Sequence, residues 1–176
     1  MIACIVAIVL LIAADQAVKF WVVENLAEGA SAPLIPGFVE LLRLHNYGAA
    51  WSSFYGMRYL LIAVTVALMA VVAALAVKRV IRHPAGLAAV TLVLAGGIGN
   101  LIDRVRLGYV VDMFNFQFMS YPVFNVADIC VVFGVILLVV YYFLFYEKYD
   151  APKKPDRDGE HGEHAKSGEH GEGDAL

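Results

Sequence analysis

The chain has 176 residues, of which 61% are hydrophobic and only 16% charged, and its mean hydropathy is +0.72. Soluble domains usually carry about 25% charged and about 45–50% apolar residues, and the apolar excess here lies in long runs, so a membrane protein is indicated. The net charge of −3 comes from the tail, because residues 147–176 hold nine acids and five bases, whereas residues 1–146 hold seven acids and eight bases. Nothing in this composition indicates nucleic-acid binding.

Four apolar segments are long enough to cross a bilayer, and we predict spanning helices over residues 1–23, 58–78, 84–104 and 123–146. The clearest is the uncharged run from 59 to 77, whose 19 residues would extend about 29 Å as a helix, close to one hydrocarbon thickness. In the fourth segment, Asp128 is the only charged residue. The expected fold is an α-helical integral membrane protein with four transmembrane helices. After it we predict a disordered polar tail over residues 147–176.

The first segment has a second interpretation, because a short apolar run at an N-terminus is typical of a signal peptide. No basic residue precedes this run and no convincing cleavage motif follows it, which favours a retained helix. Within the segment, Asp15 and Lys19 are spaced as an acid and a base one helical turn apart, in the favourable order.

Basic residues in the connections predict the orientation of the helices. Lys78, Arg79 and Arg82 lie between the second and third segments, and further bases follow the fourth. The positive-inside rule therefore places both termini and the 78–84 connection in the cytoplasm. The polar residues of the spanning segments then converge on the outer leaflet, together with Asp112 in the connection after the third segment. The residues of the segments are Asp15, Lys19, Asn100, Asp103, Arg104, Asn125 and Asp128.

Several of these residues also have an ordinary structural interpretation. Asn100, Asp103 and Arg104 share one helical face, as they would at any helix end that returns to water. Asp128 with Asn125 would suit a helix cap, although an ionisable residue inside a membrane segment is more often functional. The glycines at 96, 97 and 99 indicate close helix contacts.

Asp112 and Asp128 together predict a definite chemistry. Two carboxylates that lie close together in a poorly solvated site cannot both ionise cheaply, so the pair holds one proton. One carboxylate then takes a proton from water while the other donates, as in aspartic proteases. This chemistry needs no metal and no cofactor, and none is expected.

Five motifs, in this order along residues 1–146, resemble the bacterial lipoprotein signal peptidases, the type II or prolipoprotein signal peptidases. They are "DQAVK" (15–19), "NYGAAWS" (46–52), "GGIGNLIDR" (96–104), "VVDMF" (110–114) and "FNVAD" (124–128). Trp51 stands where the family often has Phe, and the tail has no counterpart in the family pattern.

The resemblance implies an aspartyl endopeptidase of the bacterial plasma membrane that removes the signal peptide just before a diacylglyceryl-modified cysteine. The implied partners are lipidated prolipoproteins and membrane lipid, and no oligomer is indicated. The implied catalytic dyad is Asp112 and Asp128. By the same resemblance, Asp15 and Lys19 support the structure, and the residues that shape the site and contact the peptide are Asn46, Gly48, Asn100, Asp103, Arg104 and Asn125.

The connection between the first two spanning segments contains a Val- and Leu-rich run with Glu40 and Arg43 interspersed. We predict one or two short strands there, although a helix over 38–44 fits nearly as well. The family resemblance implies a small extracytoplasmic sheet that cradles the substrate.

Two other function classes stay open at this point. A serine–lysine peptidase would use Ser52 or Ser53 as the nucleophile and Lys19 as the base. A proton-coupled transporter would use Asp15, Asp103, Asp112 and Asp128 as a relay, but a relay should be distributed through the membrane depth.

Overall fold

The computed structural model describes residues 1–49 and 53–151, and the structural statements below concern these residues. It contains four helices that are long and apolar enough to cross a membrane, which confirms the predicted fold class. Three of them are α1 (Ile2–Asn25), α2 (Arg58–Val77) and α3 (Pro84–Arg106). The fourth begins at Val126 rather than at 123 and ends at Tyr149 rather than at 146, and it consists of α4 (Val126–Tyr141), a π-helical turn (Tyr142–Tyr146) and α5 (Glu147–Tyr149).

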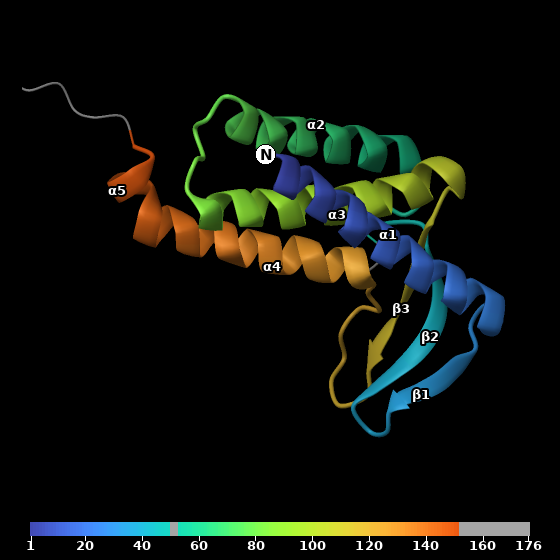
Figure 1. Ribbon diagram of the computed structural model, residues 1–176. Helices are drawn as coiled ribbons and strands as arrows, with labels where there is room; N and C mark the ends of the chain where they lie inside the picture. The colour runs from blue at the N-terminus through green and yellow to red at the C-terminus, as the bar shows by residue number, and fades with distance from the viewer. Residues whose placement is uncertain (50–52, 152–176) are drawn as a thin grey trace, which may run out of the picture.

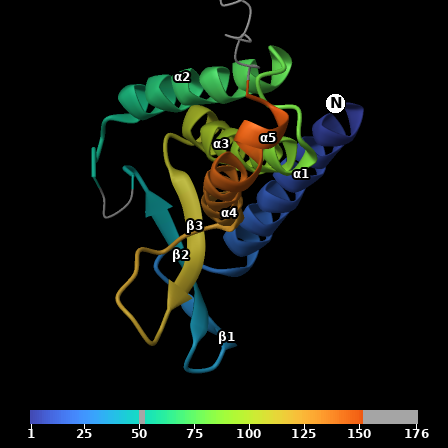
Figure 2. The same cartoon turned by 90° about the vertical axis from the view of Figure 1, so that its left-hand side faces the viewer.

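Helix α3 packs against each of the other three spanning helices, with α2 on one side and α1 and α4 on the other (Figures 1 and 2). Three glycines allow these close contacts, as expected. A Cβ added to Gly96 would collide with the carbonyl oxygen of Ala127 in α4. One added to Gly97 would lie 2.8 Å from the sulfur of Met69 in α2, and one added to Gly99 would lie 2.8 Å from Oδ2 of Asp15 in α1.

A three-stranded antiparallel sheet, in the order β1-β2-β3, lies at one end of the bundle, which we call the sheet end (Figure 1). Strands β1 (Ser31–Ile35) and β2 (Val39–Asn46) confirm the predicted strands between the first two helices, and the alternative of a helix over 38–44 is wrong. The third strand, β3 (Val110–Phe116), comes from the α3–α4 connection and was not predicted.

Two arginines cap helix ends, and of these Arg43 joins the sheet to α1 while Arg58 joins the start of α2 to α3. Arg43 in β2 donates from Nη1 to the carbonyl oxygens of Val23 and Leu26 at the end of α1, at 3.0 and 2.9 Å. Arg58 donates to the carbonyl oxygens of Arg104 and Val105 at the end of α3, both at 2.7 Å. These last carbonyls have no partner within their own helices, so the two arginines satisfy them.

The chain after β3 folds back on the strand before entering α4. The backbones of Phe114 and Phe124 form an antiparallel bridge, and their rings lie 5.6 Å apart. The ring centres of Phe116 and Phe124 are 5.1 Å apart, so Phe116 belongs to the same aromatic cluster. This bridge carries the start of α4 back over the sheet, so that residues near 112 and 128 meet.

The opposite end of the bundle, which we call the loop end, is held by the buried carboxylate of Asp150. Its Oδ2 accepts hydrogen bonds from the backbone N–H groups of Arg82 and His83, at 3.0 and 3.1 Å, and from the hydroxyl of Tyr141. Its Oδ1 accepts from Nε of Arg82 at 3.0 Å. Residues 147–150, which we expected in the tail, therefore belong to the folded part, and residues 152–176 lie outside the described residues.

We predict that Asp150→Asn destabilises the protein, whereas deletion of residues 152–176 does not, because the deletion retains Asp150. The substitution removes the charge opposite Arg82 and places an amide donor against other donors, which should cost about 1–3 kcal/mol. Thermal unfolding in detergent measures both effects. Glu147→Gln, an exposed acid nearby, is the matched control. An unchanged unfolding temperature for Asp150→Asn would contradict the assignment.

Candidate active site

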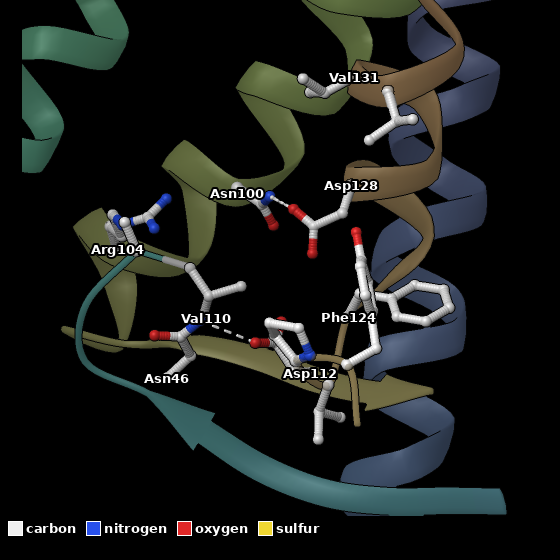
Figure 3. Close-up of a pocket in the computed structure, with 13 residues that line it drawn as sticks. Asn46, Asn100, Arg104, Val110, Asp112, Phe124, Asp128 and Val131 are labelled. Atoms are coloured by element: carbon white, nitrogen blue, oxygen red, sulfur yellow. Dashed lines mark hydrogen bonds between the residues drawn. The ribbon is translucent and has the colours of Figure 1, made fainter. Parts of the chain in front are cut away.

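A pocket of about 290 Å³ lies at the sheet end, where β2, β3, α3 and α4 meet (Figure 3). Its polar wall contains five of the residues singled out from the sequence, namely Asn46, Asn100, Arg104, Asp112 and Asp128. The apolar part of its lining is Val110, Pro122, Val123, Phe124, Val131 and Val132, with Ala49 and Tyr121 also in contact. The structure therefore brings together residues that lie more than eighty positions apart in the sequence.

Asp112 reaches the pocket from β3 and is only 1% exposed. Its Oδ2 accepts a hydrogen bond from Nδ2 of Asn46 at 2.9 Å, and its Oδ1 accepts one from Nδ2 of Asn125 at 2.7 Å. Burial, followed by the charge of Asp128, raises the pKa of Asp112 to about 7, although the two amide donors oppose this shift. At neutral pH this carboxyl group therefore holds its proton in a large fraction of the molecules.

Asp128 lines the same pocket from the first turn of α4, where it forms a capping box with Asn125. Its Oδ2 accepts from the backbone N–H of Asn125 at 3.1 Å, and Oδ1 of Asn125 accepts from the backbone N–H of Asp128 at 2.9 Å. The other carboxylate oxygen, Oδ1, accepts from Nδ2 of Asn100 at 2.7 Å, as Figure 3 shows. The capping interpretation is therefore correct, and it leaves one carboxylate oxygen directed into the pocket.

Arg104 and Gly48 connect the pocket to the segment that follows β2. Nη2 of Arg104 donates to the carbonyl oxygen of Gly48 at 3.0 Å, and the N–H of Gly48 donates to Oδ1 of Asn46 at 2.9 Å. The strand register explains the contact between Asn46 and Asp112. Asn46 in β2 pairs with Val110 in β3 and therefore lies diagonally opposite Asp112.

Asp15, Lys19 and Asp103 lie behind the pocket rather than in its wall. Nζ of Lys19 is 2.9 Å from Oδ2 of Asp15 and 2.9 Å from Oδ2 of Asp103, and all three residues are at most 3% exposed. Asp103, expected among the peptide contacts, instead pairs with Lys19 and accepts from the backbone N–H of Val111 at 3.2 Å. Gln16, which sequence reasoning did not single out, joins this group by donating to Oδ1 of Asp103 at 2.9 Å.

Sequence reasoning also missed the apolar lining of the pocket. Val131 and Val132 are ordinary members of an apolar helix, and no local signal separates them from their neighbours. Pro122 to Phe124 lie in a connection whose return over the sheet follows from the bridge to Phe114.

The geometry weighs against the serine–lysine alternative. All three N–H groups of the Lys19 ammonium have acceptors, namely Asp15, Asp103 and Asn100, so Lys19 is not placed to act as a base. Ser53 is exposed, and Ser52 lies outside the described residues. Within residues 1–49 and 53–151, no group of three or more His, Cys, Asp and Glu side chains is placed to hold a metal ion.

Comparison with known proteins gives consistent matches. A family model described as Signal peptidase (SPase) II matches residues 7–144. The chain is 45% identical over 138 residues to the lipoprotein signal peptidase of Enterococcus faecalis, in an alignment that covers 77% of this chain and 84% of that one. It is 41% identical over 140 residues to the lipoprotein signal peptidase of Streptococcus pyogenes serotype M2, and that alignment covers 77% of this chain and 90% of the other.

Two solved structures, each described as a bacterial membrane enzyme, share the fold. The first matches with a TM-score of 0.79 and 27% identity, over 88% of this chain and 96% of the other. The second matches with a TM-score of 0.76 and 28% identity, over 82% of this chain and 95% of the other. Together with the family match over residues 7–144, these similarities show that the chain belongs to the signal peptidase II family of aspartic peptidases.

Proposed function

We propose that this protein removes the signal peptide from diacylglyceryl-modified prolipoproteins by hydrolysing the peptide bond just before the lipidated cysteine. Asp112 and Asp128 are the catalytic dyad in this proposal. The observation that carries it is the meeting of two carboxylates from different elements in one pocket, each held by hydrogen-bond donors on both oxygens. Family membership supplies the substrate class.

In the proposed reaction the dyad holds one proton, which Asp112 carries because its pKa is raised to about 7. Asp128 takes a proton from a water molecule as the water oxygen bonds to the scissile carbonyl carbon, and Asp112 donates its proton to the carbonyl oxygen. The tetrahedral intermediate then collapses. Its hydroxyl proton returns to Asp112, the C–N bond breaks, and Asp128 delivers its proton to the leaving nitrogen.

The shape of the pocket supports a substrate that is partly in the bilayer. Val131 and Val132 follow Asp128 along α4 and give the pocket an apolar side within a spanning helix, where an acyl chain or the end of a signal peptide would fit. A second pocket of about 270 Å³ has Asn46 and Asp112 in common with the first. Its lining also includes Leu44 and His45 of β2, so it extends along the sheet. We propose that the chain after the cysteine leaves along this second pocket.

We also propose that the sheet end faces outward and that both termini are cytoplasmic. Three bases, Lys78, Arg79 and Arg82, lie in the connection at the loop end, which the positive-inside rule places in the cytoplasm. The dyad would then lie at the outer leaflet of the plasma membrane, where a translocated prolipoprotein presents its lipidated cysteine. Asn46, Gly48, Asn100, Arg104 and Asn125 shape this site, and Asp15, Lys19 and Asp103 support it from behind.

The dyad is tested by Asp112→Asn and Asp128→Asn, assayed on purified lipidated prolipoprotein. Each should lower kcat on the order of 10³-fold or more, because an amide neither accepts the proton of water nor holds the shared one. The double variant should be no worse than either single one, since the two carboxylates act as a unit. Ser52→Ala, Ser53→Ala and added chelator should leave cleavage measurable. Substantial turnover by either single dyad variant would contradict the mechanism.

The role of the lipid is tested by comparing the same precursor with and without the diacylglyceryl group on its cysteine. The unlipidated form should be cleaved far more slowly, because acyl chains that bury about 0.8 kcal/mol per CH₂ in the bilayer hold the scissile bond at the site. Initial rates in matched detergent or bilayer conditions measure this difference. Equal rates for the two forms would remove the lipid from recognition.

The shared proton is tested by the pH dependence of kcat/KM. The rate should fall as the pH rises above about 7, because Asp112 then loses the proton that it donates. It should also fall in acid, where both carboxyl groups are protonated and neither accepts a proton from water. A rate that keeps rising from pH 7 to about pH 9 would show that the deprotonated pair is the active form.

A further inference from the structure

Three asparagine amides point their nitrogen atoms at the dyad, and each is held in that orientation by a donor on its oxygen. Oδ1 of Asn46 accepts from the N–H of Gly48, and Oδ1 of Asn125 accepts from the N–H of Asp128. Oδ1 of Asn100 accepts from Nζ of Lys19 at 3.0 Å. The first two orienting donors are backbone groups, and the third is a side-chain cation.

Two N–H groups of the Lys19 ammonium are directed at carboxylates, and the third is directed at Asn100. An ammonium has three donors and no acceptor. Two of the donors are directed at Asp15 and Asp103, and the third at Asn100. Because Lys19 is only 3% exposed, solvent competes little for these contacts.

Reversing the Asn100 amide would be unfavourable on both of its sides. Its nitrogen would then face Nζ of Lys19 and Nδ2 of Asn125, which now donates to Oδ1 at 3.1 Å. Its oxygen would face Oδ1 of Asp128, which now accepts from Nδ2 at 2.7 Å. Donors would meet donors and acceptors would meet acceptors, so Lys19 and Asn125 together select the orientation that serves Asp128.

We propose that Lys19 is a positioning residue for the cleavage reaction, which acts by fixing the orientation of the Asn100 amide that donates to Asp128. This inference rests on the proposed function and goes beyond an ion pair that merely stabilises the bundle. Without the Lys19 N–H, the Asn100 oxygen keeps only its contact with Asn125, and Asp128 loses the Asn100 donor in a fraction of the molecules.

The positive charge of Lys19 also acts on the dyad electrostatically. The charged groups that face the two carboxylates are Arg104 in α3 and Lys19 in α1, with Asp103 and Asp15 behind Lys19. The positive charge of Lys19 lowers the pKa of Asp112. Its removal should therefore move the alkaline limb of the pH profile to higher pH.

The test is a double-mutant cycle of Lys19→Gln and Asn100→Ala, assayed on lipidated prolipoprotein. Each single variant should lower kcat on the order of 10–100-fold with a much smaller change in KM, as expected for a lost hydrogen bond to a charged group. The double variant should lose no more kcat than Asn100→Ala alone, because Lys19 acts through Asn100. In the Lys19→Gln protein the alkaline limb should also shift upward.

Gln16→Ala is the matched control, because Gln16 contacts Asp15 and Asp103 in the same buried group but not Asn100. It should lower the unfolding temperature and leave kcat and the pH profile unchanged. Losses of kcat that multiply in the double variant would overturn the proposal. So would a Lys19→Gln protein that loses thermal stability and retains kcat.

Two further variants decide the matter if Lys19→Gln does not fold. Lys19→Arg keeps a side chain that only donates, so kcat of the folded protein should stay within about threefold of wild type. Asn100→Ala removes the oriented amide itself, and a kcat within about threefold of wild type would overturn the proposal. That result, combined with a strict dependence on Asp112 and Asp128, would refute the role of Lys19 and leave the proposed function standing.

Discussion

A carboxylate that is removed from water needs hydrogen-bond donors, and this requirement organises the sheet end of the protein. Asp112 is buried and Asp128 is partly buried at the pocket, and donors from β2, α3 and the start of α4 reach all four of their oxygens. An unsatisfied buried carboxylate would destabilise the fold by several kcal/mol. Asparagine suits this role, because its amide donates to the carboxylate while its oxygen is held by a further donor.

In the proposed mechanism, the contacts that stabilise this end of the fold also position the reacting groups. Asn125 caps α4, donates to Asp112 and receives the N–H of Asp128, so the helix start and the site have one geometry. The amide donors favour the ionised form of Asp112, while burial and the second carboxylate favour the protonated form, and the balance leaves its pKa at about 7. Such a balance fits the role that we propose for Asp112, which gives up and regains a proton in every turnover.

The bundle holds this site in place through α3. Its glycines let α1, α2 and α4 approach closely, and the Asp15–Lys19–Asp103 group joins α1 to α3 directly behind the pocket. At the loop end, Asp150 performs a comparable function by tying the end of the fourth helix to the α2–α3 connection. Both ends of an otherwise apolar bundle are therefore fixed by buried carboxylates with several partners, while the lipid-facing surfaces between them supply little specificity.

The amino-acid sequence by itself determined the number of spanning helices, the gathering of polar residues at one end, and the five motifs that include Asp112 and Asp128. These features depend on hydropathy and local spacing, which are properties of neighbouring residues. Only the tertiary structure decided that Val110–Phe116 is a strand, that Asp103 faces Lys19 rather than the pocket, and that Asp150 belongs to the fold. Each of these depends on hydrogen-bond partners far away in the chain, and a residue's own neighbours do not specify which distant donor or acceptor it will meet.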